Sequence, residues 1–258
     1  MALGGSGDTG RGSEDVAEDV RATTYNVDQQ GIALLRFDRP EARNAIDTAM
    51  LEELLDHVAS ARDDAAVRVL VVSSTDHMAL SAGADVREQL DDAGRVHRME
   101  LFARLYDELT AFPKPTVAAC HGSCVGGGAE IAVACDLRVG GSNLRLRFPG
   151  AALGVPVGPA RLVSLCGLSV AKYLLLTARA VGAEQALRWG LVHRIAPAPA
   201  TEEAALELAA AVATNPPEAV ARLKRMLHDW DGVEERSRVE GAGQVEWQRS
   251  GPGLPRRP

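Results

Sequence analysis

A glycine-rich turn between two apolar segments is the feature of this 258-residue sequence that most restricts its fold. Residues 115–120 predict a buried strand, and residues 129–134 predict a short helix. Between them, the three glycines at 126–128 remove every side chain from the turn. Such a junction exposes backbone N–H groups at a helix start, where the helix dipole favours negative charge. With Glu130 in the first helical turn, the junction predicts either a tight crossover or an anion-binding site beside a carboxylate.

Strands and helices alternate along the chain on either side of this junction. Apolar and β-branched runs predict strands over residues 23–27, 31–37, 67–73, 137–140 and 191–195. Apolar residues at helical spacing predict helices over residues 47–59, 85–111, 161–166, 171–177, 183–189, 202–214 and 217–227. The alternation predicts an α/β core over residues 23–196 and a helical C-terminal region over residues 197–246. The segments 1–22 and 247–258 are expected to be disordered tails because of their polar, glycine- or proline-rich composition.

Composition excludes several classes of function. The net charge of −7 argues against a nucleic-acid-binding protein, which needs a basic face. The four cysteines form no CxxC pair and lack histidines at zinc-site spacing, so reduced thiols and no metal are expected. No membrane span is expected, because no apolar run of sufficient length stands out. The first residues lack the basic and apolar regions of a secretory signal, and a cytoplasmic location is therefore expected.

Four segments, taken together, resemble the crotonase superfamily, the enoyl-CoA hydratase/isomerase family. They are residues 39–45, residues 67–88, the glycine junction with its flanks at 121–138, and residues 183–195. The resemblance implies a spiral of ββα units with a C-terminal helical trimerisation region. It also implies a homotrimer or a dimer of trimers that binds an acyl-CoA thioester. Coenzyme A then enters as part of the substrate, and no metal or redox cofactor is needed.

The resemblance also implies a catalytic site. The backbone N–H groups of Ala84 and Gly127 correspond to the family's oxyanion hole, and Glu130 corresponds to one of its two catalytic glutamates. The implied coenzyme A contacts are Arg43, Ala45, Ala82, Asp85 and Arg87, and the implied acyl pocket contains Met99, Phe102, Leu105 and Gly150. Residue chemistry leaves alternatives: the arginines are equally well explained as solvated side chains, and Asp85 is of the type that caps a helix.

One departure from the family pattern bears directly on the chemistry. The family's second catalytic glutamate follows a proline, and here Gly150 follows Pro149. No aspartate or glutamate occurs between Leu137 and Gly182, so a local shift of alignment does not restore the carboxylate. Arg145 and Arg147 stand beside the altered loop, either as a cationic replacement or as solvated residues.

Three functions remain open. The first is a hydratase that acts through the oxyanion hole and Glu130 alone. The second is another enolate-type reaction of a CoA thioester, and the third is a protein that binds acyl-CoA with little or no turnover. His121 is expected to be a satisfied core or turn residue, and Ser123 and Cys124 do not sit in a nucleophile elbow. Lys224 is a weak candidate for a phosphate contact across a subunit boundary.

Overall fold

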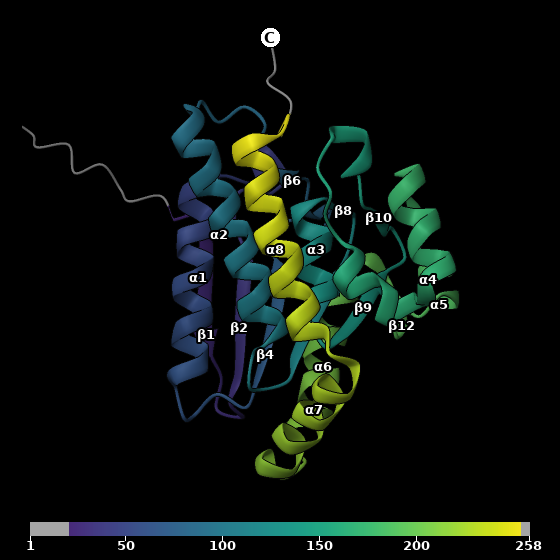
Figure 1. Cartoon of the computed structure of the whole chain (residues 1–258). Helices are drawn as coiled ribbons and strands as arrows, with labels where there is room; N and C mark the ends of the chain where they lie inside the picture. Colours follow the sequence, from purple (N-terminus) through teal and green to yellow (C-terminus); the bar gives the residue numbers. More distant parts are fainter. Residues whose placement is uncertain (1–20, 254–258) are drawn as a thin grey trace, which may run out of the picture.

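The chain builds its core from successive strand–strand–helix units. The computed structural model describes residues 21–253 (Figure 1). In each unit the first strand joins a large sheet, the second joins a smaller sheet, and a helix then returns the chain to the large sheet. This is the predicted spiral of ββα units. Most of the two predicted tails, residues 1–20 and 254–258, lies outside the described residues.

The large sheet has six strands, and five of them run parallel. Its order is β1 (Thr23–Val27), β2 (Ile32–Phe37), β4 (Val69–Ser74), β7 (Thr116–Cys120), β9 (Leu137–Gly141) and β12 (Arg194–Ala196). The first two strands form an antiparallel hairpin. The strands β4 and β7 are buried throughout, as expected for apolar runs in a parallel sheet with both faces covered.

Two smaller sheets hold the second strand of each unit. One has the order β11 (Val181–Gly182), β10 (Arg145–Arg147), β8 (Ser123–Val125) and β5 (Ala79–Ser81). The other pairs β3 (Ala45–Ile46) with β6 (Gly83–Ala84) in parallel. Residues 79–85 and 145–154 contain short strands, because each segment pairs with a neighbouring unit.

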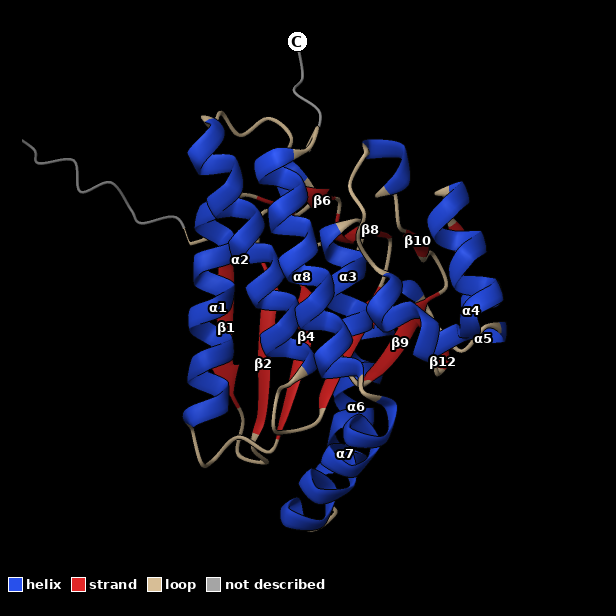
Figure 2. Cartoon of the chain, viewed as in Figure 1, coloured by secondary structure: helices blue, strands red, loops and turns tan. Residues whose placement is uncertain are grey.

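Helices cover both faces of the large sheet (Figure 2). They are α1 (Thr48–Asp63), α2 (Asp92–Thr110), α3 (Gly127–Ala134), α4 (Pro159–Thr177), α5 (Ala183–Arg188), α6 (Thr201–Ala213), α7 (Pro217–Asp231) and α8 (Val233–Ser250). Short 3-10 turns occupy η1 (Pro40–Ala42), η2 (Ala151–Leu153) and η3 (Ala198–Ala200). The first three α-helices pack on one face of the sheet, and α6 packs on the other.

The prediction that Asp85 caps a helix is wrong. The helix α2 begins at Asp92, and the cap is Asp91, whose side chain accepts a hydrogen bond from the Gly94 N–H at 2.7 Å. Asp85 follows β6, and its own N–H donates to the Ile46 carbonyl at 2.8 Å. Because pairing with β3 holds the backbone extended here, the helix starts only after an intervening turn.

Two further expectations are corrected at the C-terminal half. The predicted helices 161–166 and 171–177 form one element, α4, with a kink at Gly167. This helix is long and apolar enough to cross a membrane by length and composition alone, with a mean hydropathy of 1.4, although no such segment was expected.

The second correction is that α8 continues to Ser250, beyond the predicted start of the tail at residue 247.

The C-terminal helices are anchored to the core by a partly buried carboxylate. Asp136 accepts hydrogen bonds from the Thr116 N–H at 2.8 Å and from Lys224 of α7 at 2.7 Å. Burial alone favours the protonated form of Asp136, but hydrogen bonding to His228 and the charge of Lys224 outweigh it and lower its pKa. Lys224 thus has partners within its own chain and is not a free cation for a phosphate.

Candidate active site

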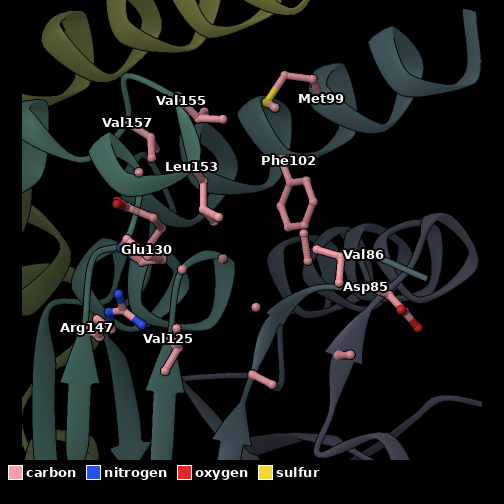
Figure 3. Close-up of a pocket in the computed structure, with 18 of the residues that line it drawn as sticks. Asp85, Val86, Met99, Phe102, Val125, Glu130, Arg147, Leu153, Val155 and Val157 are labelled. Carbon is pink, nitrogen blue, oxygen red and sulfur yellow. The ribbon is translucent and has the colours of Figure 1, made fainter. Parts of the chain in front are cut away.

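A cavity of about 450 Å³ lies between the glycine junction, the β3–β6 pair, α2 and the loop after β10 (Figure 3). Most of the residues proposed from the sequence line it: Arg43, Ala45, Ala82, Ala84, Asp85, Arg87, Met99, Phe102, Gly127, Glu130 and Gly150. Leu105 does not line the cavity. It is 1% exposed and packs in the core cluster, because it faces inward on α2.

The Ala84 N–H group is directed away from its partner strand. Successive N–H groups of a strand point to opposite sides, and the next one, that of Asp85, donates to Ile46 in β3. Among the described strands, β6 pairs only with β3. The Ala84 N–H is therefore left for a ligand at the edge where Ala84 lines the cavity.

The Gly127 N–H group is a second backbone donor at the same place. Gly127 is the first residue of α3, where the N–H groups of a helix have no partner within the helix. The β6 segment lies against it, since a Cβ atom on Gly83 would stand 3.5 Å from the Gly127 nitrogen. The two donors thus belong to segments in direct contact, although they are more than 40 residues apart in sequence.

Close approach explains why the junction contains three glycines. Gly126 has a φ of 53°, a conformation that favours glycine. A Cβ atom on Gly127 would stand 2.8 Å from the Phe102 ring and 3.3 Å from the Tyr106 hydroxyl. One on Gly128 would stand 2.5 Å from the Ser81 side chain. The missing side chains allow α3 to start directly against the cavity wall.

Glu130 is held by a buried arginine. Its side chain is 1% exposed, and its Oε2 atom accepts a hydrogen bond from Nη2 of Arg161 at 2.9 Å. The same Nη2 atom donates to Oε1 of Glu240, in α8, at 2.7 Å. The Tyr106 ring lies against the guanidinium group, 5.1 Å from centroid to Cζ. One cation therefore serves two buried carboxyl groups.

The second oxygen of Glu130 has no hydrogen-bond partner among the described residues. Burial disfavours the charged carboxylate and raises the pKa of Glu130 to about 7, and the charge of Glu240 acts in the same direction. The charge and hydrogen bond of Arg161 oppose this rise. A carboxyl group with a pKa near neutrality can take up and release a proton under physiological conditions, which suits general acid–base chemistry.

Among residues 21–253, the space next to Gly150 is occupied by backbone and apolar side chains and not by a carboxylate. A Cβ atom there would stand 2.5 Å from the Val155 carbonyl oxygen and 3.0 Å from Cγ1 of Val157. The loop after Pro149 folds back on itself, with the Val155 N–H donating to the Gly150 carbonyl at 2.8 Å. Figure 3 shows Val155 and Val157 on the Glu130 side of the cavity. The space next to Gly150 is thus filled by the Val157 side chain and by backbone.

The proposed coenzyme A residues lie at the mouth of the cavity. Arg43 has a left-handed backbone, with a φ of 53°, and both Arg43 and Arg87 are exposed. Asp85 accepts a hydrogen bond from the Arg87 N–H at 2.9 Å and lies 3.5 Å from Arg39. Exposure leaves the two arginines free to meet phosphates, and it equally fits solvated side chains.

The remaining residues that the sequence singled out are two arginines near the altered loop, a histidine and the cysteines. Arg145 and Arg147 are both exposed, and Arg147 also lines the cavity and donates from Nε to the Ala178 carbonyl at 2.8 Å. His121 is buried and lies within hydrogen-bond distance of Ser74 and of the Asp76 carbonyl. All four cysteines are free thiols. In the described part of the chain, no group of three histidine, cysteine or acidic side chains could hold a metal ion.

Sequence reasoning missed Tyr106, Arg161, Glu240 and Gln244. Arg161 carried a signal, since it is the only charged residue between Arg147 and Lys172. A lone arginine in a long apolar stretch indicates a buried ion pair, because an unpaired buried charge is too costly. The partnership with Glu240 had no local signal, because the two residues are 79 positions apart.

Comparison with known proteins identifies the family to which the chain belongs. A sequence model of the enoyl-CoA hydratase/isomerase family matches residues 27–240. The 2,3-dehydroadipyl-CoA hydratase of Escherichia coli is 34% identical over 77% of this chain and 79% of its own. The short-chain-enoyl-CoA hydratase of Clostridium acetobutylicum is 32% identical over 76% of this chain and 77% of its own.

Solved structures of similar proteins agree with this family assignment. The enoyl-CoA hydratase of Bacillus anthracis superimposes with a TM-score of 0.78 at 26% identity, over 88% of this chain and 90% of its own. The DspI protein of Pseudomonas aeruginosa superimposes with a TM-score of 0.77 at 30% identity, over 88% and 93%. The chain belongs to the enoyl-CoA hydratase/isomerase family, and the predicted crotonase-like α/β fold is confirmed.

Replacing Glu130 by glutamine should stabilise the protein at high pH. The pKa of Glu130 is raised in the folded state from 4.5 to about 7, so its contribution to stability is complete below about pH 4.5 and is lost as pH rises through 7. Glutamine resembles the protonated carboxyl at every pH. Glu130→Gln should therefore exceed the wild type in unfolding free energy by about 1–3 kcal/mol at pH 8.5, and the excess should shrink toward zero at pH 5.

The measurement is urea denaturation at both pH values. The exposed Glu235 provides the control, and Glu235→Gln should show no such dependence on pH. A Glu130→Gln protein that is less stable than the wild type at both pH values would contradict the assigned electrostatics.

Restoring the family's carboxylate at position 150 should fail. Gly150→Glu places a Cβ atom against the Val155 carbonyl, so the loop must move, and overpacking of this kind costs about 1–3 kcal/mol. Thermal denaturation and a crotonyl-CoA hydration assay should show lower stability and no gain in rate. The control is Gly243→Ala, since a Cβ atom on Gly243 meets nothing within 4 Å. Wild-type stability together with faster hydration would show that the loop is adaptable.

Proposed function

We propose that this protein acts on an acyl-CoA thioester by stabilising an enolate-like oxyanion, with enoyl-CoA hydration as the nominal reaction. The observation that carries the proposal is the meeting of two unpaired backbone donors and one buried glutamate at a single cavity. Ala84 and Gly127 supply the donors, and Glu130 lies within one helical turn of Gly127. Removing one donor from such an oxyanion hole typically lowers a rate by about 10²- to 10³-fold.

A single carboxyl group is sufficient to balance the hydration reaction. The Glu130 carboxylate accepts a proton from water while the water oxygen bonds to the β-carbon of the enoyl group. The electron pair of the double bond moves toward the thioester oxygen, where Ala84 and Gly127 donate hydrogen bonds. The protonated Glu130 then returns the proton to the α-carbon as the oxyanion collapses. The net change is addition of one water molecule.

The cavity supports a thioester with an apolar acyl group. Val155 and Val157 line the cavity on the Glu130 side and Met99 and Phe102 line it on the α2 side, while the exposed Arg43 and Arg87 also line it. An apolar interior suits a hydrocarbon chain. Exposed guanidinium groups suit the phosphates of coenzyme A. The proposed chemistry requires no metal and no redox cofactor.

One observation favours a second candidate, a protein that binds acyl-CoA with little turnover. Val155 and Val157 occupy the region where a second carboxylate would help to hold the attacking water. In addition, one oxygen of Glu130 is already engaged by Arg161. A thioester bound in the oxyanion hole without a well-placed water would remain unreacted, or would undergo another reaction that starts from the enolate.

Steady-state assays with crotonyl-CoA and longer enoyl-CoAs distinguish the two candidates. For the enzyme, Glu130→Gln should lower kcat/KM by about 10²- to 10⁴-fold, the usual contribution of a general acid or base. Glu235→Gln, an exposed change on α8, should leave kcat/KM unchanged. Tight acyl-CoA binding by calorimetry without product by mass spectrometry would favour the binder. Failure to bind any CoA thioester would exclude both.

The proposed assembly is a homotrimer or a dimer of trimers. Helix α7, which precedes the last helix of the chain, carries apolar side chains that are exposed in the single chain. The exposed fractions of Leu223, Leu227 and Trp230 are 59%, 60% and 77%. Burial of such a surface between copies would remove it from water. Analytical ultracentrifugation should give a mass of three or six chains, and Trp230→Glu should shift it toward the monomer. Met78→Glu, at an exposed site outside α7, is the control, and a monomeric wild type would contradict the proposal.

A further inference from the structure

Four helices contribute side chains to one buried cluster behind the cavity. Arg161 of α4 is its centre, with its side chain 2% exposed. Glu130 comes from α3, Glu240 comes from the C-terminal helix α8, and the Tyr106 ring comes from α2. Figure 1 shows α8 running beside α2 on the side of the molecule where α3 and the start of α4 lie. The cluster therefore connects the last helix of the chain to the candidate acid–base residue.

Glu240 is fixed by the backbone of α4 as well as by Arg161. Its two oxygens accept hydrogen bonds from the Gly158 N–H at 3.0 Å and from the Ala160 N–H at 2.7 Å. Both N–H groups lie at the start of α4, where negative charge is favoured by the helix dipole. Gln244, one turn further along α8, donates to Glu240 at 3.2 Å. This set of donors holds Glu240 as an acceptor beside the guanidinium group.

Arg161 is also oriented from a second direction. Its Nη1 atom donates to the Ser237 hydroxyl at 3.0 Å, and Ser237 in turn donates to Asp107 of α2 at 2.5 Å. With Nη1 fixed in this way, Nη2 is left between the two glutamates at 2.9 and 2.7 Å. The two carboxyl groups therefore share one donor atom and the single positive charge of the cation.

We propose that Arg161 and Glu240 are positioning residues, which hold the Glu130 carboxyl group at the cavity and set its protonation state. The C-terminal helix α8 is then part of the active site, although Glu240 does not line the cavity. The physical basis is direct. A negative charge on Glu240 weakens the hold of Arg161 on an ionised Glu130, and this favours the protonated form.

The charged and titratable groups around Glu130 act in opposite directions. Arg161 lowers the pKa of Glu130, whereas burial and Glu240 raise it to about 7. Tyr106 packs against the same guanidinium, and Arg147 lies on the cavity wall near Glu130 in Figure 3. Asp107 accepts a hydrogen bond from Ser237 and also interacts electrostatically with Arg161 and Glu240. Removing Glu240 and removing Arg161 should therefore move the titration of Glu130 in opposite directions.

The test follows the carboxyl group itself rather than turnover. The full-length protein is labelled with ¹³C at the glutamate side-chain carboxyl, and the protonated C=O band is titrated by infrared difference spectroscopy. The signal of Glu130 is assigned as the band lost in Glu130→Gln. The variants are Glu240→Gln, which keeps the side-chain shape and one acceptor oxygen, and the double variant Arg161→Gln/Glu240→Gln. The double variant avoids leaving two buried carboxylates without their cation.

The expected result is a pair of opposite shifts. In Glu240→Gln the titration midpoint of Glu130 should fall by about one pH unit, a tenfold increase in its acid dissociation constant. In the double variant the midpoint should rise above that of the wild type, because burial then acts without the arginine. Arg249→Gln removes an exposed ion pair between α8 and α2, and it should leave the midpoint unchanged.

Two results would overturn the proposal. One is an unchanged midpoint in folded Glu240→Gln protein, with folding checked by circular dichroism. The other is a shift in the same direction in both variants, since general loosening of the structure would expose Glu130 in both. The role of Glu130 in turnover rests on the proposed function, but the titration needs no substrate. Opposite shifts without any turnover would uphold the inference and count against the enzyme.

Discussion

The organisation of the candidate site depends on one buried guanidinium group, that of Arg161. Burying charges is costly, and an ion pair is retained in a protein interior only when its members are well bonded to one another and to other groups. Here Arg161 reaches Glu130, Glu240 and Ser237, and the Glu240 oxygens also accept two backbone N–H bonds. The cost of burial is thereby offset, and helices α3, α4 and α8 are fixed relative to one another. Burial of Glu130, together with the charge of Glu240, raises its pKa to about 7, and Arg161 opposes this rise only in part.

The loop after β10 decides what chemistry the cavity permits. The Val155 carbonyl and the Val157 side chain fill the space that a side chain at position 150 would need. On the Glu130 side of the cavity, this loop consequently contributes the apolar side chains of Val155 and Val157 and no carboxylate. We propose that such a site binds a thioester and stabilises an oxyanion, and that it holds the attacking water less firmly than a site with two carboxylates.

The fold shows repetition that the sequence does not. Units such as β4–β5–α2, β7–β8–α3 and β9–β10–α4 place equivalent strands in the same two sheets. No repeat of residues accompanies them, because each position needs only an apolar strand, a turn and an amphipathic helix. The two proposed oxyanion donors are brought together by this geometry, since adjacent units place β6 against the start of α3.

Local signals in the sequence determined many of the strands, turns and helix ends of this protein. The strand Thr116–Cys120, the glycine junction and the capping of α1 by Asp47 follow from apolar runs, glycine and residue type within a few positions. The resemblance to the family also pointed to the backbone N–H groups of Ala84 and Gly127 and to Glu130 as candidate site groups. Only the tertiary structure decided which groups surround Glu130, that Leu105 packs in the core, and that α2 starts at Asp92 and not at Asp85. Those outcomes depend on contacts between residues far apart in the chain, and such contacts are set by packing, not by neighbouring residues.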